Sequence, residues 1–153
     1  MASGGWLSIR VELRSGRGLV LEHPPGRVMI ASPRHSLAQL AESIDLAFAR
    51  WDHSHLHAFE LADGRRYMLG GSEFEPEVID STATTLGSLD LVRGSEFDYV
   101  FDLGDDWSHR CVLVSTDVDP VEEYGAPPEG PVPIWGWGWI PDQYGRVSED
   151  GED

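Results

Sequence analysis

Apolar and polar residues alternate in several segments of this chain, and this period of two is the feature that most constrains its fold. In residues 6–13 every second position is apolar: Leu7, Ile9, Val11 and Leu13. Residues 97–103 and 107–113 alternate in the same way and are rich in aromatic residues. Because successive side chains of a β-strand point to opposite faces, each segment is predicted to be a strand that buries one of its faces.

One segment carries a helical period instead. Its apolar residues recur every three or four positions: Leu37, Leu40, Ala41, Ile44, Ala47 and Phe48. Ser36 and Gln39 stand at the N-cap and N3 spacing, at which each side chain can bond the free backbone N–H of the other. The pattern predicts a helix that begins after Ser36, ends near Arg50 and packs its apolar stripe on a sheet.

The order of these segments predicts an α+β fold. Two strands come before the helix, and a hairpin over residues 55–69 follows it. We therefore expect an antiparallel-rich mixed sheet with one main helix packed on it, a ββαββ opening like that of a β-grasp unit, and a further hairpin. Residues 1–145 are expected to form a single domain, and residues 146–153 an acidic, disordered tail.

The net charge of the chain limits the partners that it can bind. It has 11 Lys+Arg against 27 Asp+Glu, a formal net charge of −16. Such a surface repels phosphate backbones and anionic lipids, so we do not expect direct binding to nucleic acid or to a membrane.

The one cysteine cannot form an internal disulfide, the N-terminus lacks a secretory pattern, and no apolar run approaches about 20 residues. A cytoplasmic location is expected.

Three histidines are candidates for a functional site. His55 and His57 stand two positions apart in a predicted strand, and His109 follows the Gly104–Asp106 turn of the later hairpin. A turn of these three residues would put Leu103 opposite Trp107. It would put Phe101 opposite His109, on the aromatic, core-facing side that His55 and His57 share. The parity of the strands disfavours a pairing of Asp102 with His109.

Two interpretations of these histidines stay open. His55, His57 and His109, with Asp105 or Asp106 from the turn, could bind zinc or another divalent metal that activates a water molecule. Alternatively, the imidazoles are structural and hydrogen-bond backbone carbonyls or turn carboxylates at the rim of an aromatic core. We take the structural interpretation as the default and therefore expect no cofactor.

A second candidate surface is rich in tryptophan. The stretch IWGWGWI places three indole rings on one side of an extended segment: Trp135, Trp137 and Trp139. These rings either cover the sheet as part of an extra strand or line a groove for a partner.

Two short stretches resemble the motifs of a known family. HLHAF and FDLGDDWSH are similar to the HLHEF and YDFGDDWEH motifs of the plasmid pRiA4b ORF-3-like proteins, a bacterial and archaeal family with an α+β fold. The resemblance covers roughly residues 6–115, and the matching positions are His55, Leu56, His57, Phe59, Asp102, Gly104, Asp105, Asp106, Trp107 and His109.

The chain also departs from that family's pattern. Ala58 stands where the family has Glu, Phe101 where it has Tyr and Leu103 where it has Phe, and the later PPED-GG segment is reduced to APPEG. The resemblance implies no established biochemical activity. A role in DNA transactions has been suggested for members on plasmids or mobile elements, but the charge of this chain argues against direct binding to DNA.

The sequence contains no complete catalytic set. It has no nucleophile elbow, dinucleotide-binding glycine motif or P-loop, and Cys111 lies among apolar strand residues. We expect an intracellular, non-enzymatic module that binds a protein or a small molecule. The alternative is a metal-dependent hydrolase or a nucleic-acid-processing enzyme that uses the histidine cluster, so whether the chain is an enzyme stays open.

Overall fold

The computed structural model describes residues 5–53, 55–72 and 75–145. These ranges contain nine strands, two α-helices and one 3₁₀ helix. In chain order they are β1 (Trp6–Gly16), β2 (Leu19–Val20), β3 (Gly26–Ala31), α1 (Leu37–Ala47), β4 (His57–Leu61), β5 (Arg66–Met68), β6 (Ile79–Asp80), η1 (Leu86–Leu89), β7 (Glu96–Phe101), β8 (Trp107–Val118), α2 (Pro120–Tyr124) and β9 (Val132–Trp137).

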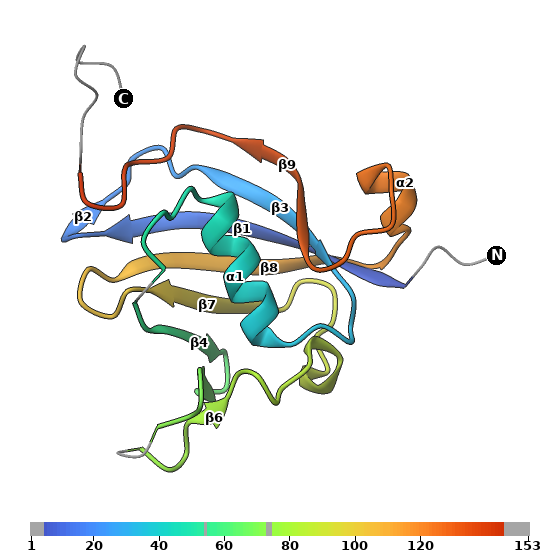
Figure 1. Ribbon diagram of the computed structural model, residues 1–153, viewed down its shortest axis with the longest axis horizontal. Helices are drawn as coiled ribbons and strands as arrows, with labels where there is room; N and C mark the ends of the chain where they lie inside the picture. Colours follow the sequence, from blue (N-terminus) through green and yellow to red (C-terminus); the bar gives the residue numbers. More distant parts are fainter. Residues whose placement is uncertain (1–4, 54, 73–74, 146–153) are drawn as a thin grey trace.

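The strands form one sheet in the order β6-β5-β4-β7-β8-β1-β3-β9, with β2 paired to β1 (Figure 1). Among the described strands, β5 and β6 pair in parallel and the other neighbours are antiparallel. The predicted α+β class with an antiparallel-rich mixed sheet is therefore confirmed.

The β-grasp-like arrangement predicted for the opening segments is not confirmed. The pair β1–β3 and the pair β4–β5 do not adjoin, because β7 and β8 lie between them. The pairing of β1 with β8 joins the two longest strands of the sheet. Joining the longest strands at the centre buries more apolar surface than an edge position would.

Helix α1 begins as the sequence predicts. The backbone N–H of Gln39 donates to Ser36 Oγ at 3.1 Å, and the backbone N–H of Ser36 donates to Gln39 Oε1 at 2.8 Å. This capping box satisfies two of the backbone donors that the first turn leaves unpaired. None of the described helices is long and apolar enough to cross a membrane.

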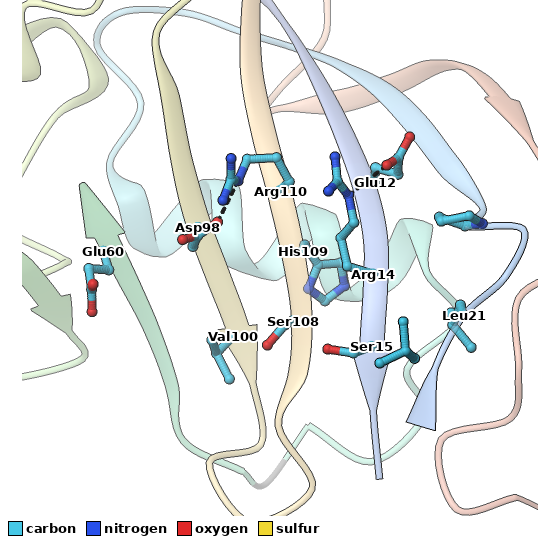
Figure 2. Close-up of a pocket in the computed structure, with 12 residues that line it drawn as sticks. Glu12, Arg14, Ser15, Leu21, Glu60, Asp98, Val100, Ser108, His109 and Arg110 are labelled. Atoms are coloured by element: carbon cyan, nitrogen blue, oxygen red, sulfur yellow. Dashed lines mark hydrogen bonds and ion pairs between the residues drawn. The ribbon is translucent and has the colours of Figure 1, made fainter. Parts of the chain in front are cut away.

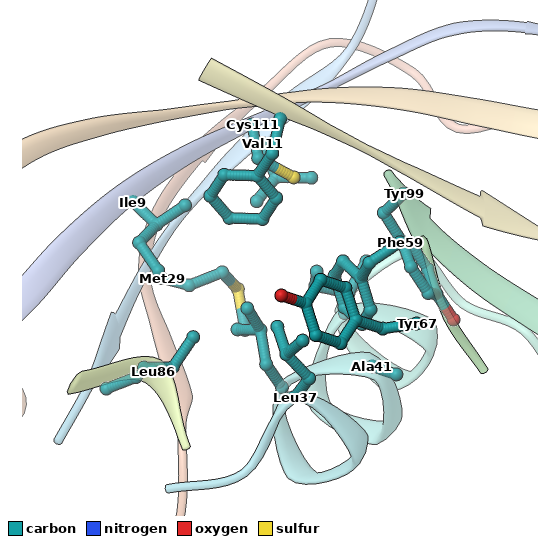
Figure 3. Packing of buried hydrophobic residues seen from close by; sticks show 14 of the residues in the cluster. Ile9, Val11, Met29, Leu37, Ala41, Phe59, Tyr67, Leu86, Tyr99 and Cys111 are labelled. Atoms are coloured by element: carbon teal, nitrogen blue, oxygen red, sulfur yellow. The ribbon is translucent and has the colours of Figure 1, made fainter. Parts of the chain in front are cut away.

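The core lies between α1 and one face of the sheet (Figure 3). The predicted inward residues of β1 and α1 are buried, apart from the partly buried Ala47, and so are the aromatic residues of β7. Cys111 is buried among them, and burial raises the pKa of its thiol. This supports its interpretation as a small core residue rather than a nucleophile.

Residues 146–153, for which a disordered tail is predicted, lie outside the described residues. The division of the chain at residue 145 stays a prediction.

Candidate functional site

The turn between β7 and β8 is longer than the sequence pattern predicts. Strand pairing sets Phe101 opposite Trp107 and Tyr99 opposite His109, so the turn comprises residues 102–106. Asp102 has a left-handed backbone, with φ of 62°, and its Oδ1 accepts hydrogen bonds from the backbone N–H groups of Gly104 and Asp105. An aspartate that bonds the backbone two residues ahead stabilises a turn of this kind.

The expected facing of Leu103 with Trp107, and of Phe101 with His109, is therefore wrong. Leu103 lies in the turn and is 36% exposed. The error arose because the left-handed backbone of Asp102 ends the alternation before Leu103. The inward direction of His109 is nevertheless as predicted. The partner of Trp107 is Phe101 instead of Leu103, a shift of two residues, and residues two positions apart on a strand point to the same face of the sheet.

His55 lies at the rim of the core, just before β4. Its Nδ1 is 3.6 Å from Asp102 Oδ2 and its Nε2 is 3.4 Å from Asp52 Oδ2. The same Nε2 also contacts the hydroxyl of Tyr144. The backbone N–H of Asp102 donates to the carbonyl of Leu56 at 2.8 Å, so the two motifs recognised in the sequence meet here.

His109 is held inside the core, 1% exposed. Its Nδ1 is 3.0 Å from the carbonyl of Tyr99, which can only accept, so this nitrogen carries the proton. Its Nε2 then accepts from Arg50 Nη2 at 3.1 Å. Burial and the charge of Arg50 lower the pKa of His109 well below its usual value. His109 is therefore a neutral imidazole with both nitrogens engaged.

Arg50 is a buried cation in an aromatic cage. It is 5% exposed, and its guanidinium carbon lies 5.4–5.7 Å from the ring centroids of Phe48, Phe101 and Trp107. Its Nη1 donates to the carbonyl of Phe48 at 2.9 Å. Burial lowers the pKa of Arg50 to about 10, so it stays charged at neutral pH. Stacking on aromatic faces suits the planar guanidinium.

Asp45 and Tyr99 extend this buried polar network. The hydroxyl of Tyr99 donates to Asp45 Oδ1 at 2.7 Å. Burial raises the pKa of Asp45 to about 7, although the Tyr99 hydrogen bond and the charge of Arg50 act in the opposite direction. Burial, together with the neighbouring Asp45, also raises the pKa of Tyr99 well above its usual value.

His57 packs as an aromatic ring. Its centroid lies 5.8 Å from that of Tyr99 and 6.2 Å from that of Phe59. Burial lowers its pKa. Its Nε2 is buried and, within the described residues, has no hydrogen-bond partner.

The three candidate histidines thus have different partners. His55 faces carboxylates, His57 faces aromatic rings, and Arg50 occupies the Nε2 of His109. Asp105 is half-buried and Asp106 exposed in the turn. No group of three or more His, Cys, Asp or Glu side chains in the described part of the chain is arranged to hold a metal ion. A metal bound at His109 would have to displace the Arg50 guanidinium, and the zinc hypothesis stays a prediction.

The three candidate tryptophans divide between covering the sheet and facing solvent. Trp137 lies over Gly26 at the end of β9, and its Nε1 donates to the carbonyl of Pro24 at 3.2 Å. The guanidinium of Arg10 lies 4.8 Å from the centroid of the Trp137 ring. Trp135 and Trp139 are 69% and 56% exposed.

The face of the sheet opposite α1 carries an open groove of about 790 Å³. Figure 2 shows this groove in front of β4, β7, β8 and β1, with α1 behind the sheet. The residues that line it are Glu12, Arg14, Ser15, Val20, Leu21, Pro24, Glu60, Asp98, Val100, Ser108, His109 and Arg110, although the imidazole of His109 itself points into the core. We call it the outer groove.

Acidic groups adjoin one another in the outer groove. Glu60 of β4 and Asp98 of β7 are directly opposite in the strand register. Arg110 Nε donates to Asp98 Oδ1 at 2.7 Å, and Arg110 Nη1 donates to Glu96 Oε1. The two hydrogen bonds raise the pKa of Arg110. Glu60 has a longer contact, 3.8 Å, with Arg66.

Sequence reasoning did not single out Asp52, Tyr144, Asp45 or the outer groove. Asp52 and Tyr144 are 92 positions apart, so no local spacing connects them. The sequence offered one signal for the buried network. Arg50 follows an apolar helical stripe closely, and a cation that is buried at such a position needs a polar partner.

Two comparisons with known proteins bear on this arrangement. A model of the plasmid pRiA4b ORF-3-like proteins matches residues 7–129. The crystal structure of MM3350 from Methanosarcina mazei Go1, described as a protein of unknown function, has a similar fold. Its TM-score is 0.69 at 16% sequence identity, over 96% of this chain and 74% of that one. No curated protein matches the sequence.

Proposed function

The chain belongs to the plasmid pRiA4b ORF-3-like family, and on this premise we propose that it is a non-enzymatic module whose outer groove binds a basic segment of a partner protein. The observation that carries the proposal is the groove itself, a hollow of about 790 Å³ on the sheet face that α1 leaves open. Two of the three motif histidines, His109 and His55, by contrast, contact the protein's own Arg50 and Tyr144 side chains.

The pairing of Glu60 with Asp98 supports a cationic ligand. Like charges directly opposite on neighbouring strands destabilise a sheet. Arg110 offsets the charge of Asp98, while the contact of Glu60 with Arg66 is long and exposed. A lysine or arginine of a partner placed beside Glu60 would relieve this repulsion.

The apolar part of the groove supports a protein ligand rather than a simple cation. Val20, Leu21 and Pro24 line one part of the groove, and Val100 lies beside the acidic pair. Burial of such surface favours a segment that carries apolar as well as basic side chains. The net charge of −16 adds long-range attraction for a basic partner.

The test titrates the full chain with a short synthetic peptide of alternating lysine and leucine and follows backbone amide signals by NMR. We expect saturable changes at outer-face positions of β4, β7 and β8. Glu60→Gln should weaken binding by about threefold to fivefold, the effect of about 1 kcal/mol from one exposed charge pair.

Glu123→Gln is the matched control, because it removes the same charge from α2, outside the outer groove. We expect it to leave affinity nearly unchanged. Equal losses in Glu60→Gln and Glu123→Gln would show that only net charge attracts the peptide, and the proposal would then fail.

A further inference from the structure

The segment after β9 is held against the loop after α1 by a glutamine side chain. Gln143 is 1% exposed. Its Oε1 accepts from the backbone N–H groups of Trp51 and Asp52 at 3.0 and 3.1 Å, and its Nε2 donates to the carbonyl of Asp52 at 2.8 Å. The side-chain amide thus satisfies three backbone groups, as a neighbouring strand would.

Tyr144 adds a second, adjacent anchor. Its hydroxyl donates to Asp52 Oδ2 at 2.7 Å and contacts His55 Nε2. Its ring meets Trp51 edge to face, with centroids 5.1 Å apart. The hydrogen bond to Asp52 raises the pKa of Tyr144 to about 12, so the hydroxyl keeps its proton at neutral pH.

Only one side of this contact lies in the part of the chain that the family model matches. Trp51, Asp52 and His55 lie within the matched residues 7–129, whereas Gln143 and Tyr144 lie beyond them. Residues 142–144 are not part of a described strand or helix. They are held by hydrogen bonds and by edge-on contacts of the Tyr144 ring with Trp51 and His55, which is how a receptor surface holds a short peptide.

The chemistry of the contact is selective. A glutamine supplies an acceptor and a donor at the positions where the Trp51–Asp52 backbone needs them, and a glutamate supplies acceptors only. The hydroxyl of a tyrosine reaches Asp52, and a phenylalanine would leave that carboxylate without this donor.

We propose that Trp51, Asp52 and His55 form a recognition site for a Gln-Tyr peptide, and that the chain's own Gln143-Tyr144 occupies it as an exchangeable intramolecular ligand. The site is separate from the outer groove, because none of Trp51, Asp52 and His55 lines that groove. A partner would engage it by presenting the same pair of side chains in place of residues 143 and 144.

The test opens the site in the full chain with the double variant Gln143→Ala/Tyr144→Ala. The probe is a synthetic peptide with the sequence of residues 140–145, Ile-Pro-Asp-Gln-Tyr-Gly, followed through the amide NMR signals of Trp51 and Asp52. We expect those signals to move in the variant and to return on addition of the peptide. The wild-type chain, whose site is filled by its own segment, should respond only at much higher peptide concentrations than the variant.

A peptide with Glu in place of Gln should bind at least tenfold more weakly. Tyr124→Ala, which removes an exposed tyrosine from α2, should leave the Trp51 and Asp52 signals in place. The proposal is overturned if the folded double variant does not bind the peptide, or if it binds the Glu peptide equally well.

A second variant covers the case in which the double variant does not fold. In Gln143→Glu the Trp51 and Asp52 amides should exchange with solvent faster than in the wild type, while the core amide of Leu113 does not change. Unchanged exchange at Trp51 and Asp52 in that variant would also overturn the proposal.

Discussion

At the scale of single residues, Asp45, Tyr99, His109 and Arg50 form a buried polar network that includes one of the three candidate histidines. Each member meets a hydrogen-bond partner or an aromatic face, so the network stabilises one arrangement of α1 against β7 and β8. The inward direction of His109 follows from strand parity. Its pairing with Arg50 does not, because the two residues are 59 positions apart and no local pattern connects them.

Asp45 gives the protein a pH-dependent stability. The unfolded chain loses the Asp45 proton near 3.8, whereas the folded chain keeps it until about pH 7. The folded state therefore binds more protons between these values, and the free energy of unfolding falls as the pH rises from about 4 to about 7. Asp45→Asn should reduce this slope, as measured by urea denaturation at a series of pH values. Asp90→Asn, at an exposed aspartate, should leave the slope unchanged, and an unchanged slope in Asp45→Asn would contradict the assignment.

At the scale of elements, β9 pairs with β3 at the edge of the sheet, and a tryptophan of β9 packs on a glycine of β3. The register sets Gly26 opposite Trp137, and a Cβ added to Gly26 would lie 2.0 Å from the Trp137 ring. The tryptophan stretch was predicted either to cover the sheet or to line a groove. Trp137 covers the sheet, while Trp135 and Trp139 face solvent.

Gly26→Ala should push Trp137 off the sheet and weaken the attachment of β9. We expect a loss of about 1–3 kcal/mol in the free energy of unfolding, the usual effect of overpacking a close contact. Chemical denaturation measures the loss, and quenching of tryptophan fluorescence reports the exposed ring. Gly130→Ala is the control, since a Cβ there meets no atom within 4 Å. Equal stability of the two variants would mean that the Trp137 contact is unimportant.

At the scale of the whole molecule, the net charge of −16 opposes compaction through repulsion among carboxylates. Added sodium chloride should therefore raise the thermal midpoint, most steeply up to about 0.1 M, where the screening length reaches about 10 Å. Sucrose at matched osmolarity controls for general solute effects. A midpoint that falls with salt would show instead that ion pairs such as Arg110 with Asp98 outweigh the repulsion.

The sequence by itself determined the elements and their buried faces. The period of two in β1, β7 and β8, the apolar stripe of α1 and its Ser36–Gln39 cap are local patterns, and side-chain direction follows from backbone geometry within a few residues. Only the tertiary structure decided the strand order, the five-residue turn at Asp102, the outer groove and the attachment of Gln143 to Asp52. Most of these features join segments that are far apart in the chain, and the turn contains two residues with a left-handed backbone, Asp102 and Asp106. Packing of the whole sheet and α1, rather than local periodicity, decides which distant side chains meet.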